Sequence, residues 1–122
     1  MSEVRVTTLK DTSGSNSSTT AEIASGRAKA WVNFNGAGAV AIRAQFNVSS
    51  ITDNGAGQYG VNFTTAMSDA NYCVSGLAHS DGSFGGVFNT TNFSSGTVNV
   101  WYIQNNSPAL LDCSFACVSI FR

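Results

Sequence analysis

The chain has 122 residues, and only 13 of them are charged, with a net charge of −1; Ser, Thr, Asn and Gly together make up 52. This length predicts a single domain with its own core. The six Lys and Arg residues are scattered along the sequence, which excludes the clustered basic surface that nucleic-acid binding requires. The chain has no apolar run long enough to span a membrane and no signal-peptide pattern at its start. We therefore expect that the protein is synthesised in the cytosol and does not insert into a membrane.

Residues 1–26 are predicted to form an N-terminal arm. Val4–Lys10 alternates β-branched and polar residues, as a strand does. Thr19 and Glu22 have the spacing of a capping box, and Gly26 is placed to end the short helix that follows. A segment so poor in apolar residues cannot form a core, so we expect the arm to attach to a neighbouring subunit or another protein. Its apolar side chains for such attachment are Val4, Val6, Leu9 and Ile23.

Residues 27–122 carry the period-two pattern of β-strands. Ala30, Val32 and Phe34 share one face of a strand, and Trp31 lies on the other. A second strand is predicted over Val40–Val48, followed by a hairpin turn at Asp53-Asn54-Gly55. A tryptophan on the outer face predicts a second contact surface, formed by another sheet or another protomer.

The second half of the chain continues the strand pattern over Asn71–Ser80, Thr97–Gln104 and Leu110–Phe121, and within Thr97–Gln104 the residues Val98, Val100 and Tyr102 share one face. About eight short strands at this spacing predict an all-β fold, an antiparallel sandwich of the jelly-roll-like kind. The last strand is apolar on both faces, which places it in the centre of a sheet or at a subunit interface. The candidate interface residues are Trp31, Val118, Ile120 and Phe121.

The spacing of the acidic, histidine and cysteine residues in the sequence indicates neither a catalytic site nor a metal site. The acidic residues are dispersed, and His79 is the only histidine, with no nucleophile elbow such as G-x-S-x-G. Cys73, Cys113 and Cys117 are odd in number and lack Cys-x-x-Cys spacing. We therefore expect free thiols in the core, no metal, no cofactor and no enzymatic activity.

Two polar loops with aromatic residues are suited to binding a glycan. Lectin-type sites stack a sugar ring on an exposed aromatic side chain and bind its hydroxyls through Asn and Asp. The alternative is that the phenylalanines close the ends of the sandwich or lie on a subunit axis. The candidate receptor- or glycan-binding residues are His79, Asp81, Phe84, Phe88, Asn92 and Phe93.

Several longer sequence segments resemble a known family. They are Val4–Gly14, Ala30–Gly36, Val40–Arg43, Phe46–Ile51, Asp53–Gly57, Val61–Phe63 and Asn71-Tyr72. Together they resemble a small β-rich module in tail-fibre and other virion-surface proteins of tailed phages, especially phages of marine bacteria and cyanobacteria. The resemblance implies a virion protein, released by lysis of the host. It also implies a homotrimer, because phage fibres are usually threefold.

Three functions remain open from the sequence. The first is a tail-fibre or receptor-binding component, with the arm bound to other virion proteins and residues 79–96 facing a host surface glycan. The second is a capsid decoration protein, which the short segment before the domain favours. The third is a free glycan-binding lectin, which the missing secretion signal disfavours.

Overall fold

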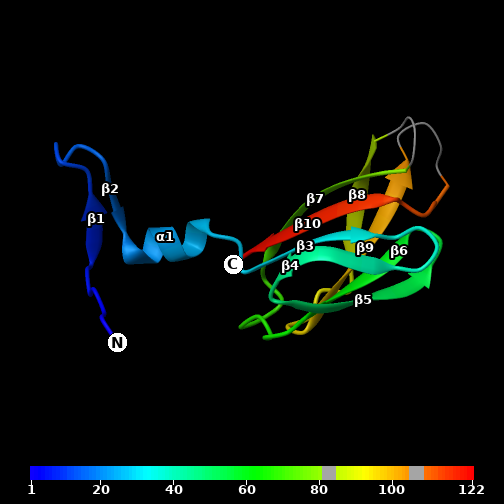
Figure 1. Ribbon diagram of the computed structural model, residues 1–122, viewed down its shortest axis with the longest axis horizontal. Coiled ribbons are helices and arrows are strands. Elements are labelled where there is room, and N and C mark those ends of the chain that lie inside the picture. Colours follow the sequence, from blue (N-terminus) through cyan, green and yellow to red (C-terminus); the bar gives the residue numbers. More distant parts are fainter. Residues whose placement is uncertain (81–84, 105–108) are drawn as a thin grey trace.

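A computed structural model describes residues 1–80, 85–104 and 109–122. It contains an N-terminal arm and a β-domain, joined end to end (Figure 1). The elements are β1 (Thr8–Lys10), β2 (Ser17–Thr19), α1 (Thr20–Gly26), β3 (Ala30–Asn35), β4 (Ala41–Phe46), β5 (Val48–Gly55), β6 (Gln58–Phe63), β7 (Cys73–His79), β8 (Gly85–Thr91), β9 (Thr97–Gln104) and β10 (Phe115–Phe121).

The arm is ordered by local hydrogen bonds. β1 and β2 form a two-stranded antiparallel hairpin, and α1 follows directly. The Thr19 hydroxyl oxygen accepts from the Glu22 amide at 3.1 Å, and the Glu22 carboxylate accepts from the Thr19 amide at 2.7 Å. The predicted capping box is thus confirmed. The predicted strand Val4–Lys10 is shorter than expected, because its partner β2 offers only three residues for pairing.

The β-domain is an antiparallel, sandwich-like structure, as the sequence predicts. Its strands are hydrogen-bonded in the order β4-β3-β10-β7-β8-β9-β6-β5. β7 and β8 pair only where Leu77–His79 meets Gly85–Val87, so the sheet folds over at this point into two layers. β10 returns beside β7 after the β7-β8-β9 meander, which is a Greek key.

The core lies between these layers and follows the predicted alternation. Phe34 of β3 and Tyr59 of β6 meet edge to face across it, with ring centroids 5.2 Å apart. The inward faces of β3 and β9 are confirmed. The fully buried side chains on these two strands are Ala30, Val32, Phe34, Val98, Val100 and Tyr102.

The predicted strand Val40–Val48 is wrong as a single element. Asn47 has a positive φ of 55° and separates β4, which pairs with β3, from β5, which pairs with β6 in the other layer. The Asn47 side chain stabilises this corner by donating to the Lys29 and Thr65 carbonyls at 3.1 and 3.0 Å. Phe46 is exposed because the β3–β4 pairing shifts register between Asn33 and Phe34, which places Phe46 opposite the outward Trp31; strict alternation would have buried it.

The β5–β6 hairpin turns later than predicted. Its turn residues are Ala56 and Gly57, two positions beyond the centre of Asp53-Asn54-Gly55. Gly57 has a positive φ of 66°, and a Cβ there would lie 2.6 Å from the Leu111 carbonyl oxygen. Only glycine fits this close approach between two chain segments.

Strand β10 occupies the centre of its layer, between β3 and β7. Val118 and Ile120 point into the core and are buried within the single chain. They cannot contact another subunit, so their assignment to a subunit interface is wrong. The apolar residues on both faces of β10 are explained by its position in the centre of the sheet, which is one of the two positions that the sequence predicts. Trp31 and Phe121 lie on the opposite face, where a second protein could reach them.

Candidate functional site

The structure does not bring the predicted glycan-binding residues together. His79 ends β7 next to the start of β8, whereas Asn92 and Phe93 follow the far end of β8. Seven residues of strand separate these ends by about 20 Å. Asp81 and Phe84 lie outside the described residues. The predicted site is therefore divided between opposite ends of the sandwich.

The aromatic members of that predicted set pack against other aromatic rings. Phe88 contacts Tyr102 edge to face, with centroids 6.4 Å apart, and is half-buried against the core. Phe93 packs on Tyr72 at 5.3 Å. His79 stacks parallel to Phe115, also at 5.3 Å. These contacts fit the alternative reading, in which phenylalanines close the ends of the sandwich.

The layer β4-β3-β10-β7 presents apolar hollows among polar side chains on the side away from the core, and we call this side the outer face. Leu77 is 71% exposed and Trp31 40% exposed on it. A shallow groove of about 390 Å³ crosses β3, β10 and β7 between these two side chains. Phe115 bounds a second depression, and the Arg43 guanidinium lies 4.8 Å from its ring centroid. The outer face thus offers adjacent apolar hollows that one chain leaves uncovered.

The arm also presents apolar side chains to solvent. Val4, Val6, Leu9 and Ile23, the residues predicted for attachment, are all exposed. No residue of α1 is buried. The structure therefore contains an ordered segment whose apolar side chains have no core to enter.

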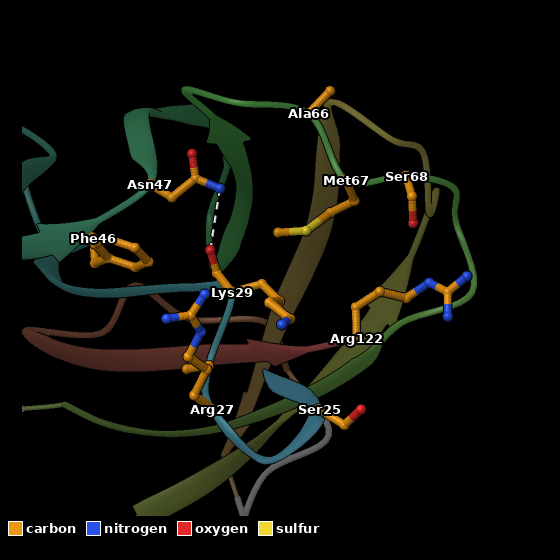
Figure 2. A pocket seen from close by; sticks show the side chains of 10 residues that line it. Ser25, Arg27, Lys29, Phe46, Asn47, Ala66, Met67, Ser68 and Arg122 are labelled. Atoms are coloured by element: carbon orange, nitrogen blue, oxygen red, sulfur yellow. Dashed lines mark hydrogen bonds between the residues drawn. The ribbon is translucent and has the colours of Figure 1, made fainter. Parts of the chain in front are cut away.

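A concave site with three basic side chains lies where the arm meets the sandwich; we call it the junction pocket. It has a volume of about 630 Å³. Figure 2 shows its wall, with cationic side chains from the segment before β3 and from the end of β10 around the sulfur-bearing side chain of Met67. The lining residues are Ser25, Arg27, Ala28, Lys29, Phe46, Asn47, Ala66, Met67, Ser68 and Arg122.

Charge is concentrated in the junction pocket. Arg27, Lys29 and Arg122 are three of the six basic residues of the chain, and no acidic side chain is among the ten described residues that line it. Arg122 forms an ion pair with Asp69 just outside the lining, with Nε 3.0 Å from Oδ1. This arginine holds the pKa of the Asp69 carboxyl below its usual value, helped by the Asn71 amide.

The other two cations differ in their contacts. The Lys29 ammonium donates to the Ala24 carbonyl of α1, which ties the arm to the sandwich. The Arg27 guanidinium has no hydrogen-bond or ion-pair partner within the described ranges 1–80, 85–104 and 109–122. The junction pocket therefore holds one unpartnered guanidinium beside a lysine.

Sequence reasoning missed this pocket. Arg27 and Lys29 lie far from Arg122 along the chain, so the basic residues are scattered in the sequence. No local pattern joins them. They meet because the Ile120 carbonyl at the end of β10 accepts a hydrogen bond from the Lys29 amide at 2.7 Å, beside the start of β3.

The thiols are free, as expected, but they are not all in the core. Cys113 is fully buried, and burial raises the pKa of its thiol. Cys73 is exposed and Cys117 is half-buried on the outer face, so the prediction of core thiols is wrong for both. These positions alternate with the inward residues of β7 and β10.

The residues that the structure describes contain no group of three or more His, Cys, Asp or Glu side chains placed to hold a metal ion. None of their helices is long and apolar enough to cross a membrane.

Comparison of the chain with protein-family models, with curated proteins and with solved structures found no match. The arm, the outer face and the junction pocket are therefore the features from which a function can be inferred.

Proposed function

We propose that this chain is a non-enzymatic structural protein on the surface of a phage virion, as a tail-fibre or receptor-binding component. The arm is the observation that carries the proposal. A two-stranded hairpin is at best marginally stable alone, and a helix of seven residues is too short to persist without packing. An arm of this kind, with exposed apolar side chains, fits a segment that is covered by another protein in an assembly.

The outer face supports contacts between copies of the chain. Trp31 and Phe121 remain candidates for the subunit interface, and Leu77 and Phe115 replace Val118 and Ile120. The threefold symmetry comes from the phage-fibre resemblance of the sequence, and we propose a homotrimer on that ground. We also propose a jelly-roll-like architecture, because eight strands with Greek-key connections are the components of that fold.

The test is cryo-electron microscopy of intact particles, with the density of this chain located and its copies counted. Density at the tail in low copy number is the expected result. Density on the capsid in high copy number would instead identify a decoration protein. Particles that lack the chain altogether would contradict a virion role and leave the free lectin.

The arm can be tested in the same particles by two matched double variants. Val4→Asp with Leu9→Asp places charges on exposed apolar side chains, and Thr7→Asp with Thr12→Asp adds the same charge to exposed polar ones. We expect the first pair to abolish incorporation and the second to preserve it. Equal incorporation of both variants would contradict attachment through the apolar side chains of the arm.

A further inference from the structure

We propose that the junction pocket binds a saccharide that carries a carboxylate, such as a uronate unit of an acidic bacterial surface polysaccharide. The proposal rests on the proposed function for the source of the saccharide. It places recognition at the boundary between α1 and the sandwich, not in the loops of residues 79–96.

The charge of the junction pocket favours an anion. Asp69 compensates Arg122, which leaves the charges of Arg27 and Lys29 without an acidic partner in the described part of the chain. Two such charges in a concave site attract a carboxylate more strongly than the same charges spread over a flat surface. The whole chain has a net charge of −1, so this local excess is not a general property of the protein.

Arg27 supplies the geometry that a carboxylate requires. A guanidinium offers parallel N–H donors that match the two carboxylate oxygens, and such charge-assisted bonds are stronger than neutral ones. The Arg27 side chain is exposed and unpartnered in the described structure, so binding would break no existing contact. The Lys29 ammonium donates one of its three protons to Ala24 and keeps the others for a ligand.

The remaining lining fits a sugar ring better than a bare inorganic anion. Phe46 is 54% exposed at the rim, and Met67 forms an apolar wall beside it (Figure 2). These groups can pack against the C–H face of a pyranose. The Ser25 and Ser68 hydroxyls have no hydrogen-bond partner among the described residues, so they are available to sugar hydroxyls.

The shape of the junction pocket is fixed by contacts on both sides. Asn47 hydrogen-bonds the Lys29 carbonyl and positions the segment before β3. The Lys29 ammonium in turn contacts the last part of α1. The volume of about 630 Å³ lies within the range of small-molecule sites and accommodates a disaccharide unit.

The experiment is calorimetric titration of the full-length protein with an oligoglucuronate and, separately, with the neutral oligoglucose of the same linkage and length. We expect binding of the acidic oligosaccharide only, weakening as salt is raised. Arg27→Gln should weaken it about tenfold, the loss expected for a charge-assisted bond. Lys10→Gln is the matched control: it removes the same charge from an exposed site in the arm and should leave affinity within about twofold.

Four outcomes would overturn the proposal. The first is absence of oligoglucuronate binding, and the second is equal binding of the acidic and neutral sugars. The third is an equal effect of Arg27→Gln and Lys10→Gln, which would indicate only general charge attraction. The fourth is displacement of the oligoglucuronate by acetate or phosphate at the same concentration, which would show that the junction pocket binds simple anions and would contradict the saccharide assignment.

A second variant guards against misfolding. Ser68→Ala removes one hydroxyl from an exposed loop and should weaken binding about threefold with an unchanged thermal midpoint. The virion role is tested separately by locating the chain on particles. If oligoglucuronate does not bind while density for the chain is present at the tail, the ligand proposal is wrong and the proposed virion function stands.

Discussion

At the scale of single residues, Tyr59 joins parts of the chain that are far apart in sequence. Its hydroxyl donates to the Gly36 carbonyl at 3.1 Å and accepts from the Cys113 amide at 3.2 Å. The side chain is fully buried, and desolvation raises the pKa of its hydroxyl far above the usual value. A buried hydroxyl with two such partners fixes the turn after β3 to the segment before β10.

Gly36→Ala is predicted to destabilise the sandwich because the new Cβ would lie 2.4 Å from the Tyr59 hydroxyl oxygen. We expect a loss of about 1–3 kcal/mol in the free energy of unfolding, the usual cost of overpacking. Gly96→Ala is the control, since its Cβ would enter open space. Urea denaturation of both variants provides the measurement, and equal midpoints would contradict the role given to Gly36.

The Asp69–Arg122 ion pair is predicted to make stability depend on pH. The folded-state pKa of Asp69 lies below its usual value of 3.8, so the pair contributes above that pH and its contribution is lost as pH falls through the folded value. Asp69→Asn should therefore be less stable than the parent at pH 7 and approach it under acidic conditions. Urea denaturation at both pH values measures the difference, and a difference independent of pH would contradict the prediction.

At the scale of elements, α1 is stabilised by its N-terminal cap and by one contact near its C-terminal end. The capping box fixes its first turn, and Lys29 contacts the Ala24 carbonyl near its last turn. None of its residues is buried, so its stability is local and only weakly coupled to the sandwich.

Thr19→Ala is predicted to open α1 without affecting the domain. Loss of an N-cap hydroxyl costs about 1 kcal/mol of helix stability. We expect faster hydrogen exchange at the Glu22 amide, which now donates to that hydroxyl, and an unchanged urea midpoint. Thr20→Ala, one residue later, is the control. A lower midpoint in Thr19→Ala would show that the arm and the sandwich unfold together.

At the scale of the whole molecule, the arm and the outer face each leave apolar side chains uncovered. The arm projects from one end of the sandwich, next to the C-terminal end of β10 (Figure 1). The outer face spans four strands of one layer. Under the proposed function, the sandwich would bind other copies of the chain and the arm would bind another virion protein.

Leu77→Glu is predicted to dissociate the proposed homotrimer. Leu77 is 71% exposed in the single chain, so the new charge costs the isolated fold little but would be desolvated between subunits. Light scattering after gel filtration should show a threefold lower mass than for the parent. Ser95→Glu adds the same charge in an exposed loop outside the outer face and should preserve the parent mass. A parent that is already monomeric would contradict the trimer itself.

Local patterns predicted much of the fold. The inward faces of β3 and β9 and the Thr19–Glu22 cap depend only on neighbouring residues, so they could be read directly. The site could not. The candidates His79 and Phe93 belong to loops whose polar and aromatic residues are suited to binding a glycan, but β8 separates them to opposite ends of the sandwich. Composition carries no information about distance between loops.

The sequence by itself determined that this chain is a β-sandwich-like domain with a capped, apolar-bearing arm, because strand alternation and capping are properties of adjacent residues. Tertiary structure alone decided that Asn47 would divide one alternating run between two layers. It also turned Val118 inward and brought Arg27 and Arg122 to the same pocket. Each of these outcomes depends on how the sheet closes, and closure is set by pairing between strands far apart in the sequence, which no local pattern contains.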